Sequence, residues 1–353
     1  MKNTESSKNS AVKNEHELIY HFCELIRQDP DLDWSAFQQR HDKSAHVSLQ
    51  LDSRRLEYEV AFKLKPSIPD LERTCRKNNK QNTLLVAPSL SNRVIQFCKE
   101  SKLSCIDLNG RAWIRAEGIL VDRGALPGRS FGYQLEPQKI FAGKSVRMVR
   151  SLLTERDRVW TQAELVKRTH LSSGMVSRLV NHFVSQSYLE KLSPREYRIR
   201  DFDGLLEEWN DADDINARCT TSFYAGPVGG FASVAQSLQN WSEQEEVGIA
   251  FTQWFAAYER HPYTEPVVCS AYLEHLPDVP TLEAMGLRQV WEGGKVWLHV
   301  PKENGLFLET QKCGELTLAT DGQIYIDLKN TGLRGPEAAE ALRDWKGFCR
   351  NEA

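Results

Sequence analysis

The stretch from residue 144 to residue 200 constrains the fold of this chain more than any other. It carries three short segments with apolar residues at helical spacing, followed by two short alternating segments around a Ser-Pro turn. Apolar residues that recur every three or four positions are typical of an amphipathic helix, and strict alternation is typical of a strand. The order helix, helix, turn, helix, hairpin predicts a winged helix-turn-helix. In such a module the third helix enters the major groove of DNA.

The second and third of these helices have recognisable start signals. Thr161 stands three residues before Glu164, which is the spacing of a capping box. Ser172 or Ser173 can cap the third helix, which we expect to end near Gln186. The apolar stripe of that helix consists of Val176, Leu179, Val180 and Phe183.

The same stretch is strongly basic. From Lys139 to Arg200 it holds 13 Lys and Arg against 5 Asp and Glu, in a chain whose formal net charge is −3. Local positive charge is the usual electrostatic footprint of a nucleic-acid site. The near-neutral total excludes a generic polycationic coat for nucleic acid, so a DNA-binding surface has to be local. The alternative is a three-helix module that binds protein.

We expect the first turn and the outer face of the third helix to contact bases. The side chain of Arg178 matches the acceptor edge of guanine, and that of Asn181 matches the edge of adenine. Basic residues on the first helix and on the wing would hold the phosphate backbone. The predicted DNA-binding residues are Lys144, Arg147, Thr161, Gln162, Ser172, Ser173, Gly174, Ser177, Arg178, Asn181, Arg195 and Arg198.

Residues 16–136 predict an α/β domain with a mixed sheet. Strand patterns come first, and helices then alternate with short apolar strands. The order resembles the core of restriction endonucleases. We expect helices at 16–27, 33–41, 68–78 and 91–102, and strands at 46–51, 56–64, 83–87, 104–108, 111–115 and 118–122.

A nuclease of that class needs a carboxylate two residues before a lysine, to hold Mg²⁺ and activate water. The candidate lysine is Lys63, but the residue two positions earlier is Ala61. Glu59 lies one pleat further away, and Asp52 is the candidate upstream acid. A site without its central carboxylate binds Mg²⁺ poorly. We therefore expect no enzymatic activity, no cofactor and no metal. A Mg²⁺-dependent nuclease using Asp52, Glu59 and Lys63 is the alternative.

A chain of 353 residues is long enough for two or three domains. Gly and Pro are enriched at 124–137, which predicts a connection, and 201–216 holds seven acidic residues and no Lys or Arg. The expected fold class is a multidomain α/β and α+β protein. Its expected parts are a disordered tail at 1–15, the α/β domain at 16–136, the winged helix-turn-helix at 137–200, an acidic linker at 201–216 and a C-terminal α+β domain at 217–353.

The last part mixes helices and strands. The Gly-rich run at 222–231 lacks the GxxxxGK[ST] pattern of a phosphate loop, so we expect a turn that leads into a helix at 231–239. Pro336 and Glu337 suit the first turn of a final helix. Strands are expected near 266–273, 295–300, 305–309 and 323–328.

Several stretches taken together resemble the AbiEi family, the antitoxins and transcriptional regulators of type IV toxin–antitoxin systems. The resemblance implies DNA binding and regulation, and it suggests a nucleotidyltransferase toxin as a partner. Within it, Asp107 is expected to be structural, because a carboxylate beside a Gly turn can accept backbone N–H bonds. The matching stretches are CIDLNGRAWI at 105–114, the predicted winged helix, FYAG at 223–226, QIYIDL at 323–328 and GLRGPEAA at 332–339.

Targeting and cysteine patterns favour the cytoplasm. No apolar run approaches the roughly 20 residues of a membrane span, and residues 1–17 lack the apolar core of a secretory signal. The eight cysteines form no CxxC pair, which is typical of reduced thiols. We therefore expect a cytoplasmic regulator of transcription that binds double-stranded DNA and no membrane. A homodimer would suit half-sites about 34 Å apart. The remaining alternative is a protein-binding module whose C-terminal domain captures a toxin or a second copy of the chain.

Overall fold

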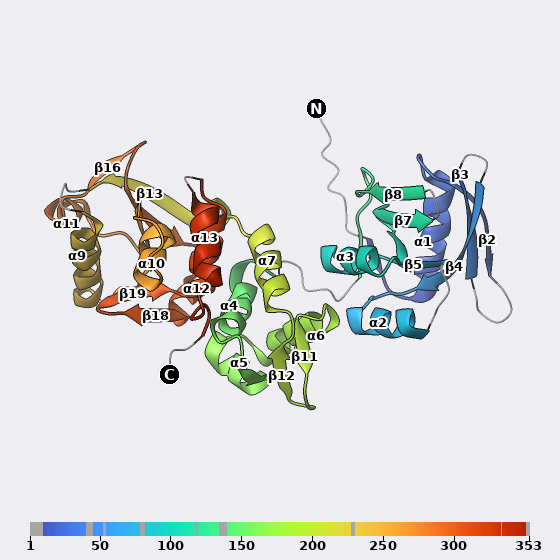
Figure 1. The fold of residues 1–353 in the computed structure, drawn as a ribbon, viewed down its shortest axis with the longest axis horizontal. Helices are drawn as coiled ribbons and strands as arrows, with labels where there is room; N and C mark the ends of the chain where they lie inside the picture. The colour runs from blue at the N-terminus through green and yellow to red at the C-terminus, as the bar shows by residue number, and fades with distance from the viewer. Residues whose placement is uncertain are drawn as a thin grey trace. The chain divides into compact units, whose positions relative to one another are not determined.

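The computed structural model describes residues 10–39, 45–51, 54–77, 82–116, 119–133, 140–226, 230–332 and 334–350 (Figure 1). The chain is a mixed α/β protein with several sheets. Its contacts divide it into two units. The first comprises residues 1–137 with 182–187, and the second comprises 138–181 with 188–353.

A seven-stranded sheet forms the centre of the first unit, with its strands in sequence order. Neighbouring strands are antiparallel except where β5 pairs with β4 and β6, where they are parallel. Parallel neighbours need a crossover, which the helices α2 (Ile68–Lys77) and α3 (Asn92–Glu100) supply. The strands are β2 (Asp33–Gln39), β3 (Ala45–Leu51), β4 (Arg54–Phe62), β5 (Thr83–Ala87), β6 (Ser104–Asp107), β7 (Ala112–Ala116) and β8 (Ile119–Arg123).

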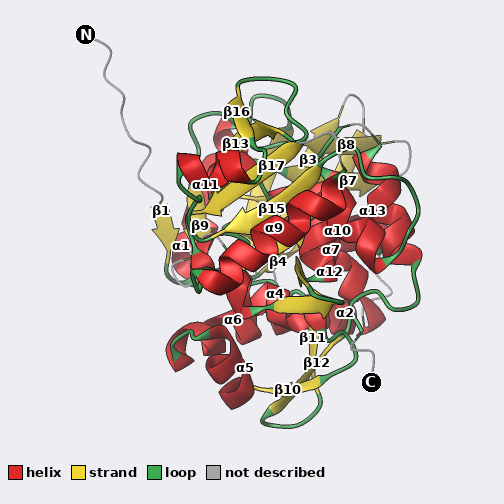
Figure 2. Ribbon diagram, turned by 90° about the vertical axis from the view of Figure 1, so that its left-hand side faces the viewer, coloured by secondary structure: helices red, strands yellow, loops and turns green. Residues whose placement is uncertain are grey.

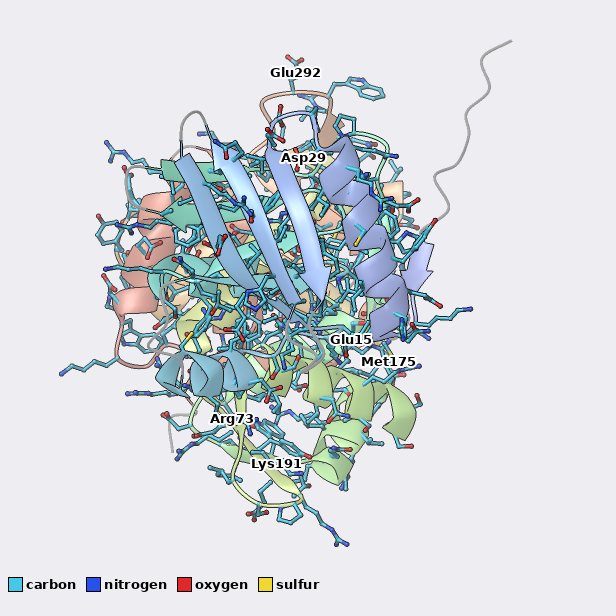
Figure 3. The ribbon with its side chains drawn as sticks, turned by 90° about the vertical axis from the view of Figure 1, so that its right-hand side faces the viewer. Glu15, Asp29, Arg73, Met175, Lys191 and Glu292 are labelled. Carbon is cyan, nitrogen blue, oxygen red and sulfur yellow. The ribbon has the colours of Figure 1, made fainter. Side chains whose placement is uncertain are left out.

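Helices cover both faces of this sheet. The helix α1 (Glu15–Gln28) runs beside the strands β2 to β4, with Glu15 and Asp29 marking its two ends (Figure 3). Along the fully buried β5, Leu84 and Val86 share one core with α1, whereas Leu85 and Ala87 share another with α2 and α3. This alternation is the period of two that a strand imposes on its side chains.

An ion pair fastens the end of α1 to the last strand of the sheet. Arg123 of β8 donates from Nη1 and Nη2 to the two carboxylate oxygens of Asp29, at 2.6 and 2.8 Å. The Asp29 side chain is fully buried. Burial works against the charged form of Asp29, but the bonds from Arg123 hold its pKa below the usual value.

The prediction of a helix at 33–41 is wrong, because residues 33–39 form β2 and pair with β3. The physical reason is an aromatic cluster in which Phe22 of α1 lies against Trp34 and Phe37 of β2, with ring centroids 6.5 and 6.2 Å apart. The expected tail and connection also contain structure. The strands β1 (Ser10–Val12) and β9 (Phe131–Tyr133) pair in parallel, while residues 1–9 and 134–139 lie outside the described residues.

The second unit contains another seven-stranded sheet, in the order β16-β13-β17-β15-β14-β19-β18. Helices α9 (Phe231–Gln244) and α10 (Gln253–Arg260) pack against its strands (Figure 2). The helices α11 (Val279–Ala284) and α13 (Gly335–Asp344) also belong to this unit. The strands are β13 (Cys219–Ala225), β14 (Ile249–Thr252), β15 (Cys269–Leu273), β16 (Arg288–Val290), β17 (Val296–Pro301), β18 (Thr310–Cys313) and β19 (Leu316–Ala319).

Three helices and a small sheet precede these elements in the chain; by their contacts, residues 182–187 at the end of the third helix belong to the first unit. Their sheet has the order β10-β12-β11. The elements are the 3₁₀ helix η1 (Gly143–Ser145), α4 (Val146–Thr154), β10 (Val159–Thr161), α5 (Gln162–Thr169), α6 (Ser173–Ser185), β11 (Leu189–Lys191) and β12 (Glu196–Ile199).

The helix α12 (Asp321–Lys329) is the centre of the second unit, because it packs against α4, α7, α10 and α13. The strand predicted at 323–328 is therefore wrong. Thr320 caps the helix by accepting from Gln323 N at 3.4 Å, and the residues that follow are buried on every side. The strand predicted at 305–309 is also wrong, since the 3₁₀ helix η2 (Asn304–Leu308) occupies it.

The expected acidic linker is helical. Residues 202–212 form α7 (Phe202–Ala212), and α8 (Ile215–Arg218) follows. The apolar side chains of Leu205, Leu206 and Trp209 are buried, so α7 is part of the core of this unit. In the described ranges no helix combines the length and the apolar character that crossing a membrane requires.

Candidate nucleic-acid interface

The apolar side chains that the sequence places at helical spacing in α4, α5 and α6 are buried. Val149 and Leu152 of α4 and Leu165 of α5 are buried. The stripe of α6 predicted from the sequence, Val176, Leu179, Val180 and Phe183, is buried as well. Trp160 of β10 and Tyr197 of β12 are paired across the small sheet and also buried. This packing leaves the opposite side of α6 for other contacts.

Local capping fixes where α5 and α6 begin. The capping box predicted for α5 is present: Glu164 N donates to Thr161 Oγ1 at 3.2 Å, and Thr161 N donates to Glu164 Oε2 at 2.7 Å. Ser172 Oγ accepts from Met175 N at 3.3 Å in the first turn of α6. His170 has a left-handed backbone with φ of 53°, which ends α5 and reverses the chain before α6.

The outer face of α6 is open from its start to Asn181, whereas His182, which follows, is buried. Ser172, Ser173, Gly174, Arg178 and Asn181 are exposed, and Ser177 is half-buried. A Cβ added at Gly174 would meet no atom within 4 Å. The side chains of Arg178 and Asn181 form no hydrogen bond or ion pair with another described residue. Their donors and acceptors are therefore available to a partner.

Four of the predicted DNA-binding residues are engaged inside the protein. Thr161 caps α5, and Gln162 Nε2 donates to Tyr197 Oη at 3.1 Å. Arg147 binds Glu303 through Nε at 2.8 Å and through Nη2, and its Nη1 donates to Thr169 O at 3.3 Å. These bonds fasten α5 to the small sheet and α4 to residues far along the chain.

The fourth engaged residue, Arg198, lies on the hairpin. It stands opposite Glu190 in the register of β11 and β12 and donates to Glu190 Oε1 from Nε at 2.9 Å and from Nη2 at 2.6 Å. The side chain of Arg195, at the hairpin turn, is exposed. Lys191, at the end of β11, is exposed too (Figure 3). The candidate residues predicted from the sequence did not include Lys191, although its place between Glu190 and the Ser-Pro turn was a usable signal.

Ion pairs reduce the positive charge that this region presents. Arg168 donates to both carboxylate oxygens of Glu309, at 2.6 and 2.8 Å, and also binds Glu155. Arg158 binds Glu155 at 2.9 Å and Glu164 at 3.2 Å. The exposed cations without an ion pair in the described region are Lys144, Lys167, Arg178, Lys191 and Arg195.

The candidate nuclease residues do not converge on a metal site. Lys63 is exposed just after β4, and Glu59 and Ala61 are half-buried within β4. No ion pair joins Glu59 to Lys63, and Asp52 lies outside the described residues. Across the described ranges, no group of three or more His, Cys, Asp or Glu residues is placed to hold a metal ion.

Asp107 has the structural role expected from its sequence context. Its buried carboxylate accepts from the backbone N–H groups of Leu90 at 3.1 Å, Asn109 at 2.9 Å and Arg111 at 3.1 Å. Burial raises the pKa of Asp107 to about 6, against the lowering effect of these three bonds. The carboxylate therefore organises the turn after β6.

The chemistry available on the α6 face is recognition by hydrogen bonds. A guanidinium and a carboxamide stand one helical turn apart on an open helix face, beside a hairpin that carries two exposed cations. Side chains of these types match the edges of guanine and adenine. Among known proteins, no family model, no curated protein and no solved structure matches this chain.

Proposed function

We propose that the chain is a DNA-binding regulator of transcription, in which residues 143–200 act as a winged helix-turn-helix. The observation that carries the proposal is the open face of α6, where Arg178 and Asn181 are exposed and have no partner in the described residues. The order of α4, α5, α6 and the hairpin supports the same proposal.

In this proposal the base-reading residues are Arg178 and Asn181. Arg178 would donate two parallel bonds to guanine O6 and N7, and Asn181 would pair with adenine N6 and N7. The free N–H groups of the first turn of α6, around Ser173 and Gly174, would bind a phosphate at the positive end of the helix. Phosphates on either side would meet the exposed cations Lys144, Lys167, Lys191 and Arg195.

Four residues that the sequence suggested as DNA contacts have a framework role in this proposal. Arg147, Thr161, Gln162 and Arg198 already bind Glu303, Glu164, Tyr197 and Glu190. Breaking the bonds of Arg147 or Thr161 to reach a phosphate would leave a partly buried group without its partner, which costs about 1–3 kcal/mol. The pair of Arg198 with Glu190 is exposed, so opening it costs no more than about 1 kcal/mol.

The same proposal includes a relation to AbiEi antitoxins, a nucleotidyltransferase toxin as partner and a cytoplasmic location. The sequence motifs that resemble that family support it. A toxin partner predicts that the purified chain and a nucleotidyltransferase encoded beside it co-elute as one complex. Separate elution at micromolar concentration would remove the toxin from the proposal and leave DNA binding intact.

The test of DNA binding begins with selection of an operator from a pool of random duplexes. The full-length chain should enrich one motif, and its affinity for that motif is then compared with its affinity for an unrelated duplex. Arg178→Ala should weaken operator binding by about 1–3 kcal/mol and relax the preference at one base pair. Arg195→Ala should weaken binding to both duplexes alike, because a phosphate contact carries no sequence information.

Arg198→Ala is the matched control, because Arg198 lies on the same hairpin but is bound to Glu190. Its affinity for both duplexes should stay near that of the wild type. Failure to enrich any motif, together with no binding to random duplex in low salt, would refute the proposal. Equal losses on operator and random duplex for Arg178→Ala would remove its base-reading role.

A further inference from the structure

A cavity of about 400 Å³ lies within the second unit, between α4 and the C-terminal part of the chain. Its walls come from α4, α7, α12 and η2, and its lining includes Val146, Arg150, Trp209, Leu306 and Gln323. Cavities of this size, mostly apolar with a few polar groups, are typical of sites for small molecules. None of the proposed DNA contacts except Lys144, at its edge, takes part in this lining.

Arg150 is the unusual group in this cavity. Its side chain is buried, yet it binds only neutral oxygens: Nε and Nη2 donate to Gln323 Oε1 at 3.3 and 3.0 Å, and Nη1 donates to Gly305 O at 3.3 Å. No carboxylate in the described residues forms an ion pair with it. Burial lowers the pKa of Arg150 to about 10, so the guanidinium remains charged at neutral pH. A buried charge without a counter-ion is costly.

A neighbouring arginine shows how the same fold compensates a buried guanidinium. Arg218 also lines the cavity, but it binds Asp213 at 2.9 Å and Asp327, and it donates to Tyr272 Oη at 2.6 Å. The carboxylate of Glu303, which acts on Arg150 through space, is likewise bound by Arg147. The carboxylates around Arg150 are thus already bound by other arginines, and Arg150 has no anionic partner of its own.

The lining indicates what kind of anion would fit. Four cations (Lys144, Arg150, Arg218 and Lys302) and three carboxylates (Asp213, Asp214 and Glu303) line the cavity, which leaves an excess of one positive charge. A single negative charge balances that excess, whereas a phosphate dianion would be repelled by the carboxylates. Both terminal nitrogens of Arg150 carry a further N–H, and a guanidinium binds a carboxylate through two parallel bonds.

The apolar wall indicates the rest of the ligand. The guanidinium carbon of Arg150 lies 5.8 Å from the centroid of the Trp209 ring. Val146 and Leu306 are buried beside it, and Phe141 and Pro301 continue the apolar lining. A flat ring with one carboxylate would therefore bury its ring against Trp209 and place its charge at Arg150.

We propose that this cavity binds a small aromatic monocarboxylate, with Arg150 as the partner of its carboxylate and Trp209 and Val146 against its ring. The proposal concerns binding alone, so it does not depend on the DNA-binding function. It also gives the C-terminal part of the chain a role as the second wall of a ligand site.

Binding is tested on the full chain by calorimetry and by ligand-observed nuclear magnetic resonance. The probes are benzoate and indole-3-acetate, and their uncharged controls are benzamide and indole-3-acetamide. At least one acid should bind with a Kd on the order of 1 mM or tighter, and its amide should bind at least about tenfold more weakly. No saturable binding of either acid, or equal binding of acid and amide, would overturn the proposal. Displacement of a bound acid by inorganic phosphate at an equal concentration would overturn the assignment to a monoanion.

Two variants localise the site. Arg150→Met should abolish the preference for acid over amide, and Ala212→Trp should block the cavity from the exposed last residue of α7 without touching Arg150. The matched control is Ala284→Trp, at the exposed last residue of α11 and outside the cavity lining. Circular dichroism confirms that each variant is folded. Should the Arg150 variant unfold, the Ala212 variant decides: acid binding equal to that of the wild type would overturn the proposal.

Discussion

The DNA affinity of the proposed interface should fall with salt less steeply than the charge of the sequence indicates. Each phosphate that is neutralised by Lys or Arg releases condensed counter-ions, so log Kobs falls with log salt by about 0.9 per contact. The sequence supplies 13 Lys and Arg between Lys139 and Arg200. Internal ion pairs engage Arg147, Arg158, Arg168 and Arg198, and burial removes Arg150.

The exposed cations left without an ion pair in the described region set the expected slope. They are Lys144, Lys167, Arg178, Lys191 and Arg195. With Arg178 reading a base, the other four can contact phosphates, which gives a slope of about −3.6 per bound protomer. Affinity then falls about 150-fold between 50 and 200 mM salt. If Arg147 and Arg198 also bound phosphates, the slope would be about −5.4 and the loss roughly 2,000-fold.

The assay is fluorescence anisotropy of a labelled operator duplex over a series of NaCl concentrations, with stoichiometry from analytical ultracentrifugation. Arg195→Ala should make the slope shallower by about 0.9, because one phosphate contact is lost. Arg198→Ala should leave the slope unchanged, because its guanidinium is bound to Glu190. A wild-type slope near the steeper value, or equal changes for the two variants, would show that the ion pairs open on binding and would refute this reasoning.

Three further predictions concern stability. Arg123→Ala leaves the buried carboxylate of Asp29 unpaired and should lower the free energy of unfolding by about 3–5 kcal/mol in urea titrations. Because Arg123 depresses the pKa of Asp29, this contribution should be lost from the wild type as pH falls below about 4; an unchanged difference between the two proteins at pH 3 would contradict it. Thr161→Ala should cost about 1 kcal/mol by removing the cap of α5, with no change in the salt slope of DNA binding. Asp107→Asn should cost about 1–3 kcal/mol, because an amide cannot accept all three backbone bonds. The raised pKa of Asp107 stabilises the fold most below about pH 4, and unfolding titrations should show that contribution disappear as pH rises through about 6.

The helices of residues 143–200 could be predicted because their signals are local. The capping box of α5 spans four residues, and the apolar stripe of α6 repeats within one helix. The segment 33–39 could not be predicted in this way, because its strand depends on pairing with β3 and on rings contributed by α1. In α12, burial on every side removed the stripe that identifies a helix, so the apolar residues of 323–328 resembled a strand.

The residues of the candidate site also divide into those whose environment follows from local sequence and those whose partners lie far along the chain. Exposure of Arg178 and Asn181 follows from their position opposite the apolar stripe of α6, which the sequence shows. The ion pair of Arg147 with Glu303 joins residues 156 positions apart, and nothing in the pattern around Arg147 indicates it. The pairing of Arg198 with Glu190 could have been predicted, because the register of a short hairpin places the two residues opposite each other.

The same distant bonds connect the wall of the proposed ligand cavity to α5, the neighbour of α6 in the proposed helix-turn-helix. Arg147 and Arg150 of α4 bind Glu303 and Gln323, and Ser151 donates to Glu309 at 2.6 Å, the carboxylate that also holds Arg168 of α5. A ligand carboxylate would bind the further N–H groups of Arg150, on the same helix whose other side chains form these bonds, so it acts on the helix that supports α5 and the proposed reading helix α6. Binding free energies at two linked sites are reciprocal. We therefore expect indole-3-acetate to change operator affinity, and operator DNA to change the affinity for indole-3-acetate by the same factor. Calorimetry of each ligand in the presence and absence of the other measures both factors. Factors of one would show that the cavity and the reading helix are uncoupled, and the bonds between them would then be scaffold alone.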